Sequence, residues 1–429
     1  MGNVVIVNGK RTAIGAFGGG LKGVAAKELG AVVMREVLLS LGIKPALPGH
    51  AQDEAPDPLK QTGLSPIEKE YWKWPEANQP IPIDEVIMGN VLQAGQGQNP
   101  GRQAMIRAGF PVQTPAISVN KVCASGMKAL ALAAATIKAG DNGIVMAGGM
   151  ENMSEVPIAM LNGRWGYRMD MPYGKTIDLM VFDGLWEIFY GYHMGITAEN
   201  IAQMYGITRD DQDRAGYESH MRARAAIKSG ILKDQIVPVV KPQKKGDPII
   251  FDTDERPMDT TMEKMGKLAP AFKKDGTVTA GNASGINDGA AALLVMSEEK
   301  AKEHGLKPIA RIKGYASGGM DPAYMGLGPI PAIRKLLRIT GTSIKDYGLF
   351  ELNEAFASQA IACMRELKID ESITNVNGSG ISIGHPVGCT GARLIIALAD
   401  EMRRRGVSLG LASLCIGGGM GMAMAIEAL

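Results

Sequence analysis

The sequence predicts a duplicated α/β fold, in which short buried strands alternate with amphipathic helices and the series occurs twice. Apolar runs and helical patterns alternate along both ends of the chain. Two short motifs of the first half recur in the second, since "SVN" and "NVN" each precede a loop and "AGGM" resembles "IGGGM". Many of the 55 glycines stand between strand-like and helix-like segments, where α/β folds turn.

The first half contains four strand-like segments and three helical patterns. The expected strands are 3–7, 83–92, 116–120 and 142–150, and the expected helices are 25–43, 101–109 and 125–140. The second half repeats the alternation over 308–316, 331–341, 347–356, 374–380, 388–406 and 409–426. We therefore infer two related α/β units.

Two stretches interrupt this alternation. Residues 156–286 mix aromatic and charged segments and are interpreted as an inserted domain, so the first unit comprises 1–155 with 287–305 and the second comprises 306–429. Residues 45–82 are rich in proline and acidic side chains, which is typical of a surface excursion. Its aromatic residues are expected to pack onto the body of the protein: Tyr71, Trp72 and Trp74.

The composition is that of an ordinary globular protein. Lys plus Arg number 46 against 44 Asp plus Glu, so no global charge favours nucleic acid or an anionic membrane. The first residues lack the pattern of a signal peptide, and we expect no apolar run of the roughly 18 residues that span a membrane. The four cysteines are far apart in sequence, which favours a reducing compartment.

Reactive side chains follow several glycine-rich strand ends, where open α/β sheets bind ligands. These are Cys123 in "NKVCASGMKAL", His385 in "GISIGHPVGCTGAR" and Cys415 in "ASLCIGGGMGMA". Asn353 and Glu354 in "LNEAF" are further candidates, although they also suit a cap of the following helix. Taken singly, each cysteine or histidine is a plausible core residue, but their joint placement favours one site.

Cys123 directly precedes a helical pattern. A helix N-terminus favours negative charge, so we expect the thiol pKa to be lowered there. A zinc site that combines His385 and Cys389 with other cysteines is disfavoured, because His-x3-Cys is not a paired ligand spacing. Cys363 falls at an apolar helical position and is assigned to the core.

Seven ordered motifs together resemble the thiolase family, and within it the biosynthetic acetyl-CoA acetyltransferase type. They are "NKVCASGMKAL", "AGGMENMS", "YGYHMGITAEN", "GTVTAGNASGINDGAAA", "NEAFA", "GHPVGCTGAR" and "CIGGGMGMA". The resemblance covers nearly the whole chain except 45–82 and implies a five-layered αβαβα core with an inserted loop domain at 156–286.

The resemblance also implies a mechanism with two thiols. Cys123, activated by His385, would take an acetyl group from acetyl-CoA, and Cys415 would remove a proton from a second acetyl-CoA to give acetoacetyl-CoA. One oxyanion hole would be His385 with a water held by Asn353. The other would be the backbone N–H groups of Cys123 and Gly417.

The resemblance assigns 156–286 to coenzyme A. The matching pantetheine, channel and acyl positions are Leu185, His193, Met194, Phe272, Ala280, Ser284, Met325 and Phe356. Basic residues that face either CoA phosphates or solvent are Arg222, Arg224 and Lys228, whereas Arg256 stands next to an arginine position of the family. Coenzyme A is expected as substrate and product, with no metal and no other cofactor.

The leading interpretation is a cytoplasmic acetyl-CoA acetyltransferase that forms a homodimer or homotetramer. "GCTG" at residues 388–391 is similar to degradative 3-ketoacyl-CoA thiolases of broader chain length, which are the nearest alternative. A non-catalytic acyl-CoA-binding or partner-binding module is disfavoured because the expected reactive residues are present. A ketoacyl synthase is disfavoured by Cys415 in "CIGGG", since such enzymes lack a second cysteine base.

Overall fold

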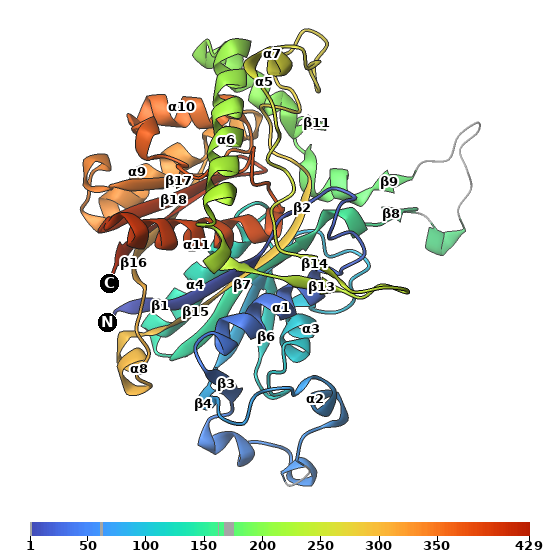
Figure 1. Cartoon of the computed structure of the whole chain (residues 1–429), viewed down its shortest axis with the longest axis vertical. Helices are drawn as coiled ribbons and strands as arrows, with labels where there is room; N and C mark the ends of the chain where they lie inside the picture. The colour runs from blue at the N-terminus through green and yellow to red at the C-terminus, as the bar shows by residue number, and fades with distance from the viewer. Residues whose placement is uncertain (1, 61–62, 162, 167–175) are drawn as a thin grey trace.

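The computed structural model describes residues 2–60, 63–161, 163–166 and 176–429. Its strands form one large mixed sheet with the order β17-β18-β19-β16-β1-β15-β7-β5-β6 (Figure 1). The first half contributes β1 (Val4–Thr12), β5 (Glu85–Gly89), β6 (Ala116–Val119), β7 (Ile144–Asn152) and β15 (Asn287–Ser297). The second half contributes β16 (Ala310–Gly319), β17 (Leu349–Leu352), β18 (Leu409–Ile416) and β19 (Met420–Ala428).

The two halves of the sheet join where β1 pairs with β16. Only a short register connects them, with Val5 opposite Arg311 and Ile6 opposite Ala310. Strands β5, β6 and β7 run parallel, and β17 runs parallel to β18, whereas β15 and β19 are antiparallel to their neighbours. The carboxyl ends of the parallel strands in each half therefore lie at one edge of the sheet.

Helices α4 (Ser125–Ala139) and α11 (Val387–Arg405) form the layer between the two halves. Both are buried along most of their length, and small residues let them approach closely. A Cβ atom on Gly126 would lie 2.9 Å from the Ala392 nitrogen, and one on Gly391 would lie 2.4 Å from the Met127 nitrogen. This contact brings the first turn of α4, just after Cys123, beside the first turn of α11, just after His385.

The outer faces of the sheet are covered by separate helices. Helices α1 (Ala26–Leu39) and α3 (Pro100–Arg107) pack on the first half, and α9 (Pro329–Thr340) and α10 (Ala357–Leu367) pack on the second. The order of layers is therefore αβαβα, and the predicted fold class is confirmed.

One helix stands apart from the expectation about membrane spans. The stretch Val122–Ala139 has a mean hydropathy of 1.3 over 18 residues, which is long and apolar enough to cross a membrane by length and composition alone. The expectation that no run reaches this length is therefore wrong. Of this window, 56% is buried inside the structure, because its helix α4 lies in the middle layer, where both faces need apolar side chains.

The described part of residues 43–82 contains β3 (Ile43–Ala46), α2 (Pro66–Tyr71) and β4 (Gln79–Pro82), with 3₁₀ turns between β3 and α2, at the lower end of the molecule in Figure 1. Trp74 is buried here, and its Nε1 donates a hydrogen bond to the Gly109 carbonyl at 2.7 Å. The Arg35 guanidinium lies 4.4 Å from the Trp74 ring centroid. Trp74 therefore packs onto the body as expected.

The described part of 156–286 includes two long helices, α5 (Met194–Tyr205) and α6 (Arg209–Ser229), and the short helix α7 (Met262–Gly266). It also includes two-stranded ribbons: β8 (Ile158–Ala159) with β9 (Ile177–Asp178), β10 (Trp186–Glu187) with β11 (Tyr192–His193), and β13 (Val239–Lys241) with β14 (Ile249–Phe251). Helices α5 and α6 contact α10, so this segment lies over the edge of the second half. The division of the chain into three parts stays a prediction.

Candidate active site

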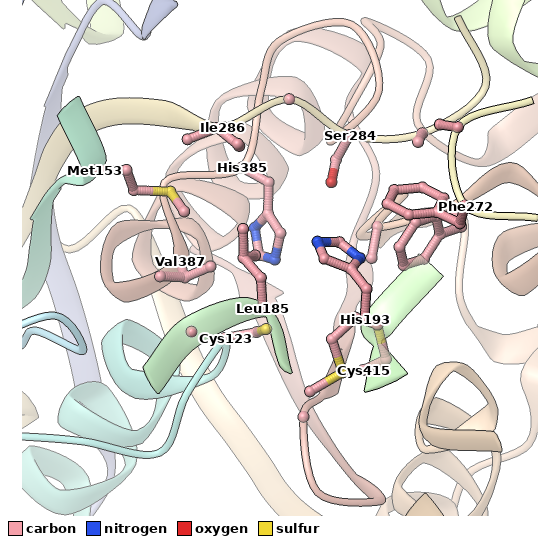
Figure 2. A pocket seen from close by; sticks show the side chains of 18 of the residues that line it. Cys123, Met153, Leu185, His193, Phe272, Ser284, Ile286, His385, Val387 and Cys415 are labelled. Carbon is pink, nitrogen blue, oxygen red and sulfur yellow. The ribbon is translucent and has the colours of Figure 1, made fainter. Parts of the chain in front are cut away.

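One cavity of about 270 Å³ brings together most of the residues that the sequence singled out. Cys123, His385, Cys415 and Gly417 line it, and Figure 2 shows the labelled side chains around the same space. All eight expected substrate-binding residues also line it: Leu185, His193, Met194, Phe272, Ala280, Ser284, Met325 and Phe356. The cavity therefore joins both halves of the sheet with the segment 156–286.

Cys123 sits in a turn between the end of β6 and the start of α4. The preceding residue, Val122, adopts a left-handed φ of 47°, which is strained for a β-branched residue. Two side chains hold this turn, since Asn120 Oδ1 accepts from the Val122 N–H at 2.9 Å and Ser125 Oγ donates to the Val122 carbonyl at 2.7 Å. This turn conformation directs the Cys123 side chain into the cavity.

The expected low pKa of Cys123 is not found. The cysteine lies before the N-cap residue Ala124 rather than within the first turn of α4, and burial raises its pKa to about 11. Hydrogen bonds from the backbone N–H groups of Gly417 and of Cys123 itself act in the opposite direction but are outweighed. The resting sulfur is therefore a neutral thiol that must lose its proton during the reaction.

His385 is held at the start of α11 by two polar neighbours. Its backbone N–H donates to Asn287 Oδ1 at 3.0 Å, and its Nδ1 lies 2.7 Å from Thr390 Oγ1. The Thr390 hydroxyl donates its only hydrogen to the Pro386 carbonyl at 2.9 Å, so it accepts the Nδ1 proton of His385. The Nε2 atom is then unprotonated and available as a proton acceptor.

The imidazole of His385 is neutral. Burial, together with the nearby guanidinium of Arg393, lowers its pKa to about 3. Arg393 is itself buried in α11 and pairs with Glu351 of β17 at 3.6 Å. A neutral imidazole beside a neutral thiol can take the thiol proton when an acyl thioester is present.

Asn353 directly follows β17 and lies beside this histidine. Its Nδ2 is 3.5 Å from His385 Nε2, and its Oδ1 accepts no hydrogen bond from the described residues. Helix α10 has Phe356 as its N-cap, so the alternative that Asn353 or Glu354 caps this helix is wrong. Glu354 instead accepts hydrogen bonds from Ser219 and Asn375 at 2.6 and 3.0 Å.

Cys415 is the penultimate residue of β18, and Gly417 follows in the turn to β19. Burial raises the pKa of the Cys415 thiol well above its usual range, and the nearby Cys123 raises it further. A Cβ atom on Gly417 would lie 2.8 Å from Met194 Cε. The backbone N–H of Gly417 donates toward the Cys123 sulfur, and the absence of a side chain leaves room for the Met194 methyl group beside it.

The walls of the cavity differ in character. An aromatic wall is built by His193, Phe272 and Phe356, with the first two rings stacked at 4.5 Å and the last two edge to face at 6.2 Å. His193 Nδ1 accepts the N–H of Gly195 at 3.1 Å, and burial lowers the His193 pKa, so its Nε2 carries a proton. An aliphatic wall on the Cys123 side combines the expected Leu185 with Met153, Ile286 and Val387.

Sequence reasoning missed several residues that position this site. Met153, Ile286 and Val387 line the cavity, and Asn287 and Thr390 hold His385. All five lie inside the motifs quoted above. The residues predicted from these motifs bear reactive side chains or match positions of the family. The five missed residues act instead through tertiary contacts, which the sequence does not reveal.

The basic residues of α6 and the segment after β14 lie outside the cavity lining. Arg222 donates to the Thr374 carbonyl at 2.9 Å, Arg224 pairs with Asp259 at 3.3 Å, and Lys228 is exposed. Arg256 donates to the carbonyls of Ala280, Ala283 and Ile381 at 3.2, 2.8 and 2.7 Å. Arg256 therefore stabilises the loop that carries Ala280 and Ser284.

The remaining cysteines belong to the core. Cys363 is buried among the side chains that pack α10 on the second half, and Cys389 is buried in the first turn of α11 in the middle layer. Among the described residues, no group of three or more His, Cys, Asp and Glu side chains is arranged to hold a metal ion.

Comparisons with known proteins agree with this fold. The model of the thiolase N-terminal domain matches residues 77–299, and that of the thiolase C-terminal domain matches 306–428. The acetyl-CoA acetyltransferase of Syntrophomonas wolfei is 54% identical over 99% of both chains, and that of Pseudomonas aeruginosa is 50% identical over 99% of both. The crystal structure of the Bacillus anthracis acetyl-CoA acetyltransferase superimposes with a TM-score of 0.88 at 44% identity, over 100% of this chain and 99% of the other.

Proposed function

This chain belongs to the thiolase family, and from that premise we propose that it is an acetyl-CoA C-acetyltransferase. It condenses two molecules of acetyl-CoA to acetoacetyl-CoA and CoA, or cleaves acetoacetyl-CoA in the reverse direction. The observation that supports this most strongly is the convergence of Cys123, His385 and Cys415 on one cavity. Two thiols and one neutral imidazole are what a two-stage acyl transfer with carbon–carbon bond formation requires.

In the first stage, Cys123 Sγ attacks the thioester carbonyl of acetyl-CoA. Nε2 of His385 accepts the thiol proton and then gives it to the departing CoA sulfur, so that the acetyl group remains on Cys123. The carbonyl oxygen becomes an oxyanion in the tetrahedral intermediate. The backbone N–H groups of Cys123 and Gly417, which already point at the sulfur, stabilise this charge.

In the second stage, Nε2 of His385 accepts the Cys415 thiol proton, and the resulting thiolate removes a proton from the methyl carbon of a second acetyl-CoA. The enolate carbon attacks the acetyl group on Cys123, and Cys123 leaves as a thiolate, which takes the proton from Nε2 of His385 and so restores the resting state. The enolate oxygen is stabilised by Nε2 of His385, in its protonated form, and by a water held on Asn353. Asn353 Oδ1 has no hydrogen-bond donor among the described residues, which supports its role as the site of that water.

Coenzyme A is the substrate and product of this cycle, which requires no other cofactor. The pantetheine arm is proposed to follow the aromatic wall of His193, Phe272 and Phe356, which offers apolar surface and one N–H donor. The acyl group on Cys123 then faces the aliphatic wall of Met153, Leu185, Ile286 and Val387.

A degradative 3-ketoacyl-CoA thiolase is the second candidate, and the aliphatic wall favours it. Flexible apolar side chains such as Met153 and Leu185 can rearrange around an acyl chain longer than acetyl. Comparing the cleavage of acetoacetyl-CoA with that of a six-carbon 3-ketoacyl-CoA separates the two functions. A strong preference for the longer substrate would favour the second candidate without changing the chemistry.

The covalent mechanism is tested by intact mass after incubation with acetyl-CoA. The native chain gains one acetyl group, Cys123→Ala gains none, and Cys363→Ala, which alters a buried core thiol, behaves like the native chain. Cys415→Ala acetylates Cys123 but forms no acetoacetyl-CoA. An unmodified native chain, or an adduct that survives in Cys123→Ala, would contradict the proposal.

Assembly and location complete the proposal. We propose a homodimer or homotetramer, and light scattering would measure which of these forms. Exposed apolar side chains on and beside the β8–β9 ribbon support such an interface: Ile158, Met160, Leu161 and Trp165. All four cysteines are free thiols, which supports a reducing compartment such as the cytoplasm.

A further inference from the structure

Glu151 is a fully buried carboxylate at the end of β7, immediately beside the catalytic cavity. Its Oε1 accepts hydrogen bonds from Asn90 Nδ2 at 2.7 Å and from the Leu92 N–H at 3.2 Å. Its Oε2 accepts from the Val91 N–H at 3.0 Å and from the Gly388 N–H at 2.9 Å. One side chain thus binds two separate segments, the loop after β5 and the loop that carries His385.

The loop after β5 is in turn bound to the cysteine turn. Asn120 Nδ2 donates to the Val91 carbonyl at 3.3 Å, and Asn120 Oδ1 accepts from the N–H of Val122, the residue before Cys123. A continuous series of hydrogen bonds therefore runs from the His385 loop through Glu151, Val91 and Asn120 to the nucleophile.

The backbone at the Glu151 end of this series is packed as closely as it can be. A Cβ atom on Gly388 would lie 2.6 Å from Glu151 Oε2, and one on Gly149 would lie 2.0 Å from the Gly388 carbonyl oxygen. Only glycine at both positions lets the His385 loop reach the carboxylate. The close packing leaves Glu151 as the acceptor for the Gly388 N–H.

We propose that Glu151 is a positioning residue for the acyl-transfer step, holding Cys123 and His385 at the separation that proton transfer requires. It touches neither substrate nor the reacting atoms, and it acts through Gly388 on one side and through Val91 and Asn120 on the other. This role rests on the proposed function, because it presupposes that Cys123 is acetylated.

The charge of Glu151 matters because all four partners are donors. A protonated carboxyl loses acceptor capacity and adds a donor of its own, which weakens the series. The pKa of Glu151 is raised to about 7, chiefly by burial and in part by the carboxyl of Asp288 on β15, while the N–H groups of Val91, Leu92 and Gly388 oppose the rise. The thiols of Cys123 and Cys389 are its other titratable neighbours, and both have raised pKa values and stay neutral.

The test is the single-turnover rate of Cys123 acetylation, followed by quenched-flow mass spectrometry from pH 6 to pH 9. In the native chain the rate falls as the pH drops through about 7, because Glu151 takes up a proton. This fall at low pH is called the acid limb of the profile below. Glu151→Gln places an NH₂ group against N–H donors, so its rate is lower by about 10²-fold and loses this acid limb, while the KM for acetyl-CoA stays within about threefold. Glu151→Asp keeps the charge and restores part of the rate and the acid limb.

Asn120→Ala is the second variant, and its exposed position keeps the fold intact. It removes the end of the hydrogen-bond series nearest Cys123 and lowers the acetylation rate by about tenfold. The double variant Asn120→Ala/Glu151→Gln is no slower than Glu151→Gln alone, because both changes break the same series. Glu68→Gln is the matched control, since Glu68 is also buried and accepts backbone N–H groups of Ser65 and Val112, at 2.7 and 3.1 Å, far from the cavity. It acetylates at the native rate.

Two results would overturn the inference: native-rate acetylation by Glu151→Gln, or effects of the two variants that multiply in the double variant. If Glu151 had a purely structural role, Glu151→Gln would have a lower melting temperature, like Glu68→Gln, and its acetylation rate would still show the acid limb. Failure of the native chain to acetylate would instead reject the proposed function.

Discussion

Nδ1 of His385, just before α11, and the hydroxyl of Thr390, in the first turn of α11, lie 2.7 Å apart, and this contact determines which ring nitrogen carries the proton. The Thr390 hydroxyl is already committed to the Pro386 carbonyl at 2.9 Å, so it can only accept from the imidazole. Nε2 is therefore unprotonated, and in the proposed mechanism it is the nitrogen that receives the thiol proton of Cys123.

Thr390→Val is expected to lower kcat by about 10²-fold with little change in KM, because valine has the shape of threonine but cannot accept the Nδ1 proton. Without that acceptor, the imidazole of His385 also adopts the other tautomer, in which Nε2 carries the proton and cannot accept one. Thr390→Ser keeps the hydroxyl and retains most of the activity. Steady-state kinetics of acetoacetyl-CoA cleavage measure both variants, and equal activity of the valine and serine variants would reject this role.

Alkylation of Cys123 by iodoacetamide is expected to accelerate steadily with pH. Because burial raises the pKa of this thiol to about 11, its thiolate fraction at pH 7 is small and grows about tenfold per pH unit up to about pH 10. The pKa of His385, lowered to about 3, adds no inflection between pH 5 and pH 8. Inactivation rates measured from pH 6 to pH 10 test this, and a plateau near pH 7 would mean that the sulfur is already ionised.

The sequence predicts the alternation of strands and helices well, because periodicity records which face of each element is buried. Helix α4 illustrates this, since the helical pattern at 125–140 corresponds to Ser125–Ala139 in the structure. Strand β15, which pairs with both β1 and β7, was not among the expected strands, although it is buried along most of its length. Its run of small alanines at 290–292 carries little periodicity, and tertiary pairing decides its conformation.

The reactive residues of the site were predictable for a different reason. Cys123 and His385 follow strand-like segments and Cys415 lies within one, each next to glycines, so chain order alone suggests a shared edge. The direction of the Cys123 pKa shift was not predictable. It depends on how many side chains surround the sulfur, and the helix N-terminus lies two residues too far along the chain to offset that burial.

Gly417→Ala is expected to lower kcat by about 10²–10³-fold through the loss of one oxyanion-hole donor. The added methyl group would lie 2.8 Å from Met194 Cε and 3.4 Å from Val122 Cγ1, so the Met194 terminus moves and the methyl group presses on the turn before Cys123, which shifts the N–H of residue 417 relative to the sulfur. The Met194 terminus is flexible, and the fold survives. Gly266→Ala, where a methyl group meets no atom within 4 Å, is the control and keeps native kinetics.

Phe272→Ala is expected to raise the KM for acetyl-CoA by about tenfold while kcat changes little. Phe272 is the central ring of the aromatic wall, stacked on His193 at 4.5 Å and edge-on to Phe356 at 6.2 Å. Its contact with the pantetheine arm is the same in the bound substrate and in the transition state, so its loss weakens binding without slowing chemistry. Phe272→Tyr keeps the ring and the native KM. Initial rates at varied acetyl-CoA separate the two constants, and a fall in kcat at unchanged KM would place the ring beside the acyl group instead.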